Sequence, residues 1–241
     1  MPESNWIIYL KKSVLTLLKH PNPKTLYSVL HYYKYWKSHL TKGRNSLDDH
    51  TPWIAFSAID FLEKIVRRDM KVFEYGSGGS TMFWAAKAGS VISVEHDPAW
   101  FEKMNMYLNK QNQPNVEYVL AEPEADPDFA GKDYKNPDDY ISSDSSYKGK
   151  NFETYVKTID RFPDRSFDII IVDGRARPSC IQHSLGKLKK NGILIIDNTE
   201  RSYYTSPFEF EKTSWKILKF AGPVPYTYDF SETTFFKKLT K

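Results

Sequence analysis

The stretch Lys71–Thr81, KVFEYGSGGST, decides which fold this chain adopts. Val72 and Phe73 are typical of a buried strand, and the run that follows is rich in glycine. Glycine lets a backbone turn sharply and approach a ligand closely, so the run predicts a binding loop. The sequence STMFWAAKAG, from Ser80, predicts a helix that begins directly after the loop. A strand, a glycine turn and a helix N-terminus together predict a nucleotide-binding loop.

Apolar runs on both sides of this stretch extend the pattern. A helix is expected over TPWIAFSAIDFLEKIVRR, with Pro52 in its first turn. The strands expected after KVFEY are VISVE, VEYVL, FDIIIVD and GILIIDN, with helices between them. Strands that alternate with helices predict a mostly parallel sheet wound on both faces, which is a Rossmann-like α/β fold. The tail WKILKFAGPVPYTYDFSETTFFKK predicts two more strands, which add an antiparallel hairpin to the sheet edge.

Residues 1–50 differ in composition from the rest of the chain. Their eight lysine and arginine residues face only Glu3, Asp48 and Asp49. Apolar residues between Trp6 and Leu18 recur near helical spacing, and TLYSVLHYYKYWKSHL predicts a second helix. We therefore expect a helical extension over residues 1–50 and a main domain over residues 51–241. The extension either packs on that domain or forms a basic amphipathic surface for a membrane or a partner.

Composition narrows the class of protein. The chain of 241 residues is long enough for one sizeable core, and its formal charge of +4 is too weak to favour nucleic acid. Cys180 is the single cysteine, which excludes an intrachain disulfide and a cysteine metal cluster. The sequence contains no apolar run of roughly 18–20 residues and no signal-peptide pattern. A cytoplasmic protein is expected, and contact with the inner face of a membrane through residues 1–50 is the alternative to packing of that segment on the main domain.

The loop sequence distinguishes between nucleotides. In Gly76-Ser77-Gly78-Gly79-Ser80-Thr81 the third glycine of a dinucleotide fingerprint is missing. Glu74 would repel a diphosphate and attract a cation, which favours S-adenosylmethionine, a ligand with a sulfonium and an amino group. In VISVEHD the expected strand VISVE ends at Glu95, twenty-one residues after Glu74. An acid at this position can accept hydrogen bonds from ribose hydroxyls. NAD and S-adenosylmethionine share that ribose, and either acid alone is also compatible with a solvated strand end.

Four successive motifs resemble those of class I S-adenosylmethionine-dependent methyltransferases. They are VFEYGSGGST, VISVEHD, FDIIIVDG and LKKNGILIIDN, and the resemblance covers about Pro52–Asn198. It implies a seven-stranded sheet and cofactor contacts from Glu74, the loop 76–80 and Glu95. It also places the residues near Ala121 and Glu122 beside the adenine. The phrase VDGRARPSC and the tail are similar to a bacterial subgroup that modifies glycans and small molecules.

Polar residues at two further strand ends carry the expected chemistry. Methyl transfer to a hydroxyl requires alignment and removal of a proton, and Asp173 at the end of FDIIIVD is the candidate base. Asp173, Asp197 and Asn198 could together hold Mg²⁺ or Ca²⁺. This arrangement is similar to metal-dependent O-methyltransferases of the catechol type, but the segment after Asp173, Gly174-Arg175-Ala176-Arg177, departs from that pattern. The alternatives are a metal-free base and acids that only brace strand ends.

Other residues are candidates for the acceptor side of the site. Arg175 and Arg177 suit an acidic group on the acceptor or a structural pairing with nearby acids. Tyr203 and Tyr204 either line an acceptor pocket or are ordinary loop aromatics. His96 either touches the cofactor or belongs to a turn, and His183 is expected to be a packing or surface residue. The irregular segment 121–150 leaves a strand end and is a candidate lid loop.

Together these patterns predict an S-adenosylmethionine-dependent methyltransferase that acts on a hydroxyl of a sugar or another polar small molecule. The alternatives are a metal-independent N-methyltransferase and a non-catalytic cofactor-binding scaffold of a glycan assembly system. A nucleic-acid methyltransferase is disfavoured because the basic residues cluster outside the core. The chain also has no N/D-P-P-Y/F motif near IVDG.

Overall fold

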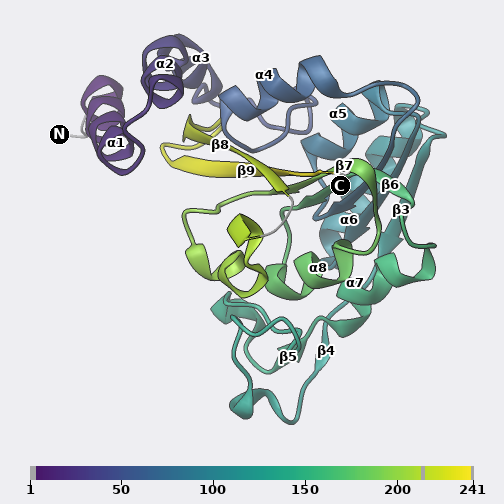
Figure 1. The fold of residues 1–241 in the computed structure, drawn as a ribbon. Helices are drawn as coiled ribbons and strands as arrows, with labels where there is room; N and C mark the ends of the chain where they lie inside the picture. Colours follow the sequence, from purple (N-terminus) through teal and green to yellow (C-terminus); the bar gives the residue numbers. More distant parts are fainter. Residues whose placement is uncertain (1–3, 213–214, 240–241) are drawn as a thin grey trace.

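A seven-stranded sheet forms the centre of the computed structural model, which describes residues 4–212 and 215–239 (Figure 1). The strand order is β3-β2-β1-β6-β7-β9-β8. The first five strands in this order run parallel, and β9 is antiparallel to both β7 and β8. The strands are β1 Lys71–Tyr75, β2 Ser90–Glu95, β3 Val116–Leu120, β6 Phe167–Val172, β7 Leu188–Ile196, β8 Trp215–Pro223 and β9 Phe230–Lys238. This topology confirms the predicted fold class, hairpin included.

Helices cover both faces of the sheet because alternate side chains of each strand point to opposite faces. On β1, Phe73 and Tyr75 pack with the residues of α7 and α8, while Val72 packs on the opposite face with α4 and α5. The main helices are α4 Phe56–Ile65, α5 Gly79–Lys87, α6 Pro98–Lys110, α7 Glu153–Lys157 and α8 Arg177–Ser184. Short 3₁₀ turns span Phe129–Gly131, Ser145–Tyr147, Thr158–Arg161, Ser202–Tyr204, Ser206–Phe208 and Phe210–Lys212.

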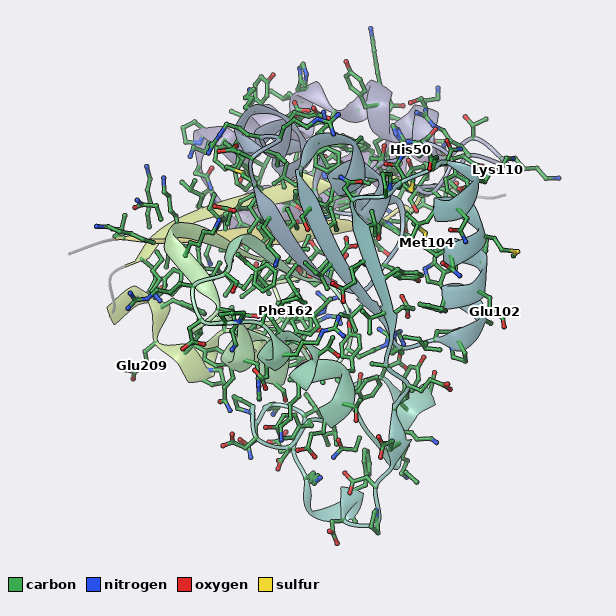
Figure 2. All side chains as sticks on the ribbon, turned by 90° about the vertical axis from the view of Figure 1, so that its right-hand side faces the viewer. His50, Glu102, Met104, Lys110, Phe162 and Glu209 are labelled. Atoms are coloured by element: carbon green, nitrogen blue, oxygen red, sulfur yellow. The ribbon has the colours of Figure 1, made fainter. Side chains whose placement is uncertain are left out.

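Helix α6 shows how one amphipathic element is oriented. Figure 2 shows it in profile, with Met104 on the inner side and Glu102 on the outer side. Met104 is buried against Met82 of α5 and Leu47 of the N-terminal segment. His50 lies near the C-terminal end of α6, where its Nε2 is 3.2 Å from the hydroxyl of Tyr107. The segment before α4 therefore packs on the main domain.

The N-terminal residues form three helices rather than the two expected. These are α1 Asn5–Lys19, α2 Pro23–His31 and α3 Tyr33–His39, and the expected second helix is interrupted at Tyr32. Tyr9, Tyr32 and Trp36 form a small core with Phe56 of α4. In Figure 1 the three helices lie beyond the β8–β9 edge of the sheet, with α1 farthest out. No described helix is long and apolar enough to cross a membrane.

Three boundaries differ from the sequence-based expectation. Helix α4 begins at Phe56 and not near Pro52, so Trp53 belongs to the preceding loop. The segment after α7 continues as a 3₁₀ turn. The run SCIQHSLGKLKK predicts one helix, but helix α8 ends at Ser184, Lys187 lies in the turn that follows, and Lys189 and Lys190 belong to strand β7.

The irregular segment 121–150 is an ordered excursion. Its ends pair as two short antiparallel strands, β4 Glu124–Ala125 and β5 Lys150–Asn151. In Figure 1 it extends away from the sheet below α7 and α8. Its contacts with the β6–α8 loop place part of it over the candidate site described next.

Candidate functional site

A cleft of about 850 Å³ opens at the carboxyl ends of strands β1, β2, β6 and β7. These strand ends converge because parallel strands present the same edge of the sheet. The sequence-predicted residues that line it are Gly76, Ser77, Gly78, Gly79, Ser80, Glu95, His96, Asp173, Arg175, Asp197 and Asn198. Four other candidates, Glu74, Glu122, Arg177 and Tyr203, do not line this cleft.

The glycine loop has a different constraint at each glycine. Gly76 has a φ of +91°, and a Cβ there would lie 3.1 Å from the carbonyl oxygen of Asp173. A Cβ on Gly79 would lie 2.0 Å from the carbonyl oxygen of Ser46. A Cβ on Gly78 would meet no atom within 4 Å. Gly76 and Gly79 therefore allow close backbone packing, whereas Gly78 leaves open space in which a ligand can approach the loop.

Glu74 lies beneath the loop and not in the cleft. Its buried carboxylate accepts hydrogen bonds from Thr81 Oγ1 (2.6 Å), Ser93 Oγ (2.7 Å) and Trp84 Nε1 (3.1 Å). Thr81 Oγ1 in turn accepts a hydrogen bond from the backbone nitrogen of Gly78 at 3.0 Å. Glu74 thus fixes the start of α5 against β1 and β2. Burial raises the pKa of Glu74 to about 7, although hydrogen bonds from Ser80, Thr81 and Ser93 oppose the rise.

Glu74→Gln is expected to change how stability depends on pH. In the folded protein the pKa of Glu74 is about 7, against 4.5 for an ordinary glutamate. Between these values the folded state retains a proton that the unfolded chain has lost, so stability falls as pH rises. Each such proton corresponds to a slope of at most about 1.4 kcal/mol per pH unit. The amide resembles the protonated acid, so the variant should lose this slope in urea titrations.

The matched control for this measurement is Glu63→Gln on α4, whose carboxylate forms an exposed ion pair with Lys87. Its stability should follow the wild-type pH dependence. If Glu74→Gln also followed it across this pH range, the Glu74 carboxyl would be ionised throughout in the folded protein.

Glu95 closes β2 and faces the cleft. Its carboxylate accepts hydrogen bonds from Ser77 Oγ (2.7 Å), the backbone nitrogen of His96 (2.8 Å) and that of Asp97 (2.9 Å). Burial alone would raise the pKa of Glu95, but its donors and the neighbouring His96 lower it to about 2. The side chain is therefore an ionised hydrogen-bond acceptor, held in a fixed position at the edge of the cleft.

Aromatic side chains form the end of the cleft beside Glu95. His96 Nε2 is 2.8 Å from the hydroxyl of Tyr147, a residue of the excursion 121–150. Trp100 Nε1 donates to the carbonyl oxygen of Ser77 at 3.1 Å. These three rings offer a surface for a flat ligand group. Glu122, expected beside the adenine, is exposed outside this wall.

Asp173, Arg177 and Asp197 form a cluster at the opposite side of the cleft. Arg177 is buried and donates from Nη2 to Asp173 Oδ1 (3.0 Å), from Nε to the carbonyl oxygen of Gly174 (3.0 Å), and from Nη1 to that of Asp197. Asp197 Oδ1 accepts a hydrogen bond from Thr233 Oγ1 at 2.6 Å. Burial, followed by the charge of Asp173, raises the pKa of Asp197 to about 8. Burial also raises the pKa of Asp173, against the opposing charges of Arg177 and Arg175.

This cluster does not fit the metal site that Asp173, Asp197 and Asn198 suggested. A guanidinium already supplies the positive charge between the two strand ends, and Thr233 holds one Asp197 oxygen. A divalent cation would lie beside the charge of Arg177 at close range. Among residues 4–212 and 215–239, no group of three or more His, Cys, Asp or Glu side chains is arranged to hold a metal. No chemical step is therefore assigned to a metal ion.

A second pocket of about 390 Å³ adjoins the cleft and shares Gly174, Arg175 and Arg201 with it. The remaining lining residues are Tyr134, Ile141, Ser142, Ser143, Asp144, Ser145, Ala176, Arg177, Pro178, Tyr203 and Tyr204. Three guanidinium groups thus face one carboxylate. Arg175 is 3.1 Å from Asp144, and its buried Nε has no hydrogen-bond partner among the described residues. The substrate candidates Arg175, Arg177 and Tyr203 meet in this pocket.

Comparisons with known proteins bear on the fold. No family model matches the chain, and no curated protein matches its sequence. A presumed O-methyltransferase from Klebsiella pneumoniae superimposes with a TM-score of 0.56 at 16% identity, over 91% of this chain and 100% of that one. The O-methyltransferase TomG from Streptomyces achromogenes, involved in tomaymycin synthesis and solved with S-adenosylmethionine, gives 0.53 at 14% identity over the same shares. The chain has the class I methyltransferase fold.

Several cleft residues of this methyltransferase fold escaped the sequence reasoning. Ser46 and Trp53 come from the segment before α4, and Asp229 comes from the turn between β8 and β9. No local pattern marks them, because long-range packing brings them to the cleft. Two aromatic residues could have been suspected from their positions in the sequence. Trp100 lies shortly after the strand that ends at Glu95, and Tyr147 lies in the candidate lid. His183 lies outside both pockets, where its Nδ1 is 2.7 Å from Asp160 Oδ2.

Proposed function

We propose that this chain is an S-adenosylmethionine-dependent methyltransferase that acts on a hydroxyl group of a polar small molecule. The charge of the cleft is the main observation that supports S-adenosylmethionine as the cofactor. Six carboxyl groups line it against the two guanidinium groups of Arg175 and Arg201, and even with Asp197 protonated the acidic groups outnumber the basic ones. The six are Glu95, Asp97, Asp173, Asp197, Glu200 and Asp229. Such a lining favours a ligand with cationic sulfur and amino groups over an anionic dinucleotide.

The loop and the β2 end would hold the cofactor. Gly78 leaves room for close approach to the backbone, and ionised Glu95 is positioned to accept hydrogen bonds from a ribose diol. The rings of His96, Trp100 and Tyr147 would cover the base. When bound, S-adenosylmethionine supplies a methyl group that its sulfonium has already activated.

Asp173 is the proposed base for the acceptor hydroxyl. Its side chain is 26% exposed and lines the cleft where the second pocket joins it. Arg177 donates to Oδ1, and the carboxylate has a second oxygen that can accept the hydroxyl proton. A raised pKa makes this carboxylate a stronger base than an ordinary aspartate. The acceptor oxygen then bonds to the methyl carbon as the carbon–sulfur bond breaks.

The second pocket supports an acceptor that carries an acidic group, such as a sugar acid or a sugar phosphate. Arginine side chains recognise carboxylate and phosphate through paired N–H donors. Arg175 and Arg201 can contribute such donors to the pocket, whereas Arg177 already donates to Asp173 and to two backbone carbonyls. The Tyr203 hydroxyl donates to Ser143 Oγ at 3.2 Å and ties the excursion 121–150 to the pocket wall. A hydroxylated anion in this pocket would lie next to Asp173.

Calorimetric titration tests the proposed cofactor. We expect S-adenosylmethionine to bind at about micromolar Kd without added Mg²⁺, and NADH not to bind under the same conditions. Glu95→Gln should weaken binding by about 10–100-fold, because it removes a charged acceptor of ribose hydroxyl bonds. The exposed glutamate of α6 provides the control variant, Glu102→Gln, which should bind like wild type.

Two results would contradict the proposal. Tight binding of NADH, or binding of neither ligand, would leave the chain without a methyltransferase assignment. Binding of S-adenosylmethionine without turnover on any of a panel of sugar acids and sugar phosphates would favour a cofactor-binding scaffold.

A further inference from the structure

Helix α1 is amphipathic in the reverse of the usual sense, with its apolar face turned outward. The large apolar side chains exposed on it are Trp6, Ile7, Leu10, Val14, Leu15 and Leu18. Ile7, Leu10, Val14 and Leu18 are spaced to share one helix face. The buried residues on the opposite side are Tyr9 and Ser13, and Ser13 Oγ has no hydrogen-bond partner among the described residues. A surface helix normally buries its apolar stripe, so this face is suited to contact with a partner that residues 4–212 and 215–239 do not supply.

The charge around this face restricts what can cover it. Residues 4–47 contain eight lysine and arginine residues and no aspartate or glutamate. Lys12 forms an exposed ion pair with Asp229 at 2.9 Å, and Arg44 pairs with Asp49, which leaves an excess of positive charge on the N-terminal residues. A second copy of the chain would bring the same positive charge to the contact, so self-association through this face is disfavoured. The cover should therefore be anionic.

The shape of this region favours a lipid surface over an acidic protein. Figure 1 shows α1 at the left-hand end of the molecule, a protruding helix beyond the β8–β9 edge. Such a helix can enter a bilayer interface along its length, whereas a protein partner would have to supply a matching groove. Trp6 and, on α2, Tyr27 are exposed aromatic residues of the kind that settle at the membrane interface. Leu26 and Leu30 of α2 are exposed as well.

We propose that α1 binds in the plane of an anionic lipid bilayer, with the lysines of the N-terminal helices against the headgroups. The apolar face contributes burial in the acyl boundary, and the lysines contribute attraction to anionic lipid. This proposal does not rest on the methyltransferase assignment. It has a consequence for the cleft, because Trp36 of α3 donates to the carbonyl oxygen of Thr227, and Thr227 and Asp229 line the cleft. Docking would hold that rim of the cleft at a fixed position near the bilayer.

Vesicle flotation of the full chain tests the proposal. The probes are vesicles of phosphatidylcholine alone and of phosphatidylcholine mixed with phosphatidylglycerol. We expect binding to the mixed vesicles that weakens as salt is raised, and much less binding to the neutral ones. Leu15→Gln/Leu18→Gln, at side chains 57% and 75% exposed, should weaken binding at least about tenfold. Met106→Gln, at a side chain of α6 that is 67% exposed, is the matched control and should bind like wild type.

A second variant separates charge from apolar burial. Lys19→Glu/Lys24→Glu keeps the apolar face and should also weaken binding to the mixed vesicles, by at least about 25-fold, because two lysine contributions are lost and two repulsive charges are added. Unchanged melting temperatures would show that the variants fold. The proposal is overturned if the wild-type chain fails to bind the mixed vesicles, or if the leucine pair binds as well as wild type. It is equally overturned if gel filtration shows a dimer that the leucine pair abolishes while vesicles do not bind.

Discussion

Asp173→Asn should lower the rate of methyl transfer by about 10²–10⁴-fold, which is the usual contribution of a positioned general base. The assay is formation of S-adenosylhomocysteine with an acceptor that supports turnover by the wild-type chain. Asparagine keeps an oxygen for the Arg177 Nη2 hydrogen bond but cannot take up the hydroxyl proton. Cofactor affinity should therefore change much less than kcat. Wild-type kcat should fall as pH is lowered through the pKa of Asp173, which burial raises above its ordinary value.

The neighbouring acid provides the comparison for this result. The pKa of Asp197 is raised to about 8, so its side chain is mostly protonated at neutral pH, and an amide imitates that state. Asp197→Asn should therefore lose far less activity than Asp173→Asn. If the two variants lost activity equally, or if Asp173→Asn turned over like wild type, Asp173 would not be the base.

The fold followed from patterns that are local in the sequence. Short runs rich in apolar, β-branched and aromatic residues favour strands, and the runs ending in Tyr75, Glu95 and Val172 form them. Glu95 at the end of β2 and Asp173 directly after β6 were placed at the cleft for the same reason, because a parallel sheet aligns its strand ends. Glu95 and Asp173 therefore lie where the sequence suggested, at the edge of the cleft.

The roles of the buried site residues could not be predicted from the sequence, because they depend on contacts between residues that are distant in the chain. Glu74 lies near a strand end like Glu95, but it is one residue before the last residue of β1, and its side chain meets Ser93 and Trp84 under α5 instead of facing the cleft. The alternation along β1 fixes that direction, and the partners come from another strand and a helix. In the same way, two backbone carbonyls and Asp173 capture Arg177, a residue that the sequence offered to a substrate. The role of a buried carboxylate or guanidinium is set by its hydrogen-bond partners, and local sequence patterns do not identify those partners.

Arg177→Met should lower the free energy of unfolding by about 3–5 kcal/mol, the usual effect of removing one member of a buried ion pair. Methionine fills much of the space over the Tyr204 ring, which lies 5.1 Å from the guanidinium carbon. It leaves Asp173 Oδ1 and the carbonyl oxygens of Gly174 and Asp197 without their donor. Urea unfolding measures the loss. Arg175→Met is the control, because Arg175 is partly exposed and its ion pair with Asp144 contributes at most about 1 kcal/mol.

The Arg177→Met variant also decides how the two acids relate to a metal. With the guanidinium gone, Asp173 and Asp197 lose the neighbouring positive charge, and carboxylate oxygens are ligands that divalent ions prefer. We expect Mg²⁺ to leave the stability of the wild-type chain unchanged, because Arg177 supplies the positive charge there. If Mg²⁺ stabilised the variant and not the wild type, the arginine would stand in the place of a metal ion. If Mg²⁺ stabilised the wild type as well, the metal would bind beside Arg177, and the two acids would interact with both the metal and the arginine. If Mg²⁺ stabilised neither, the strand ends would be shaped for a guanidinium alone, and proton removal would belong entirely to the carboxylate of Asp173.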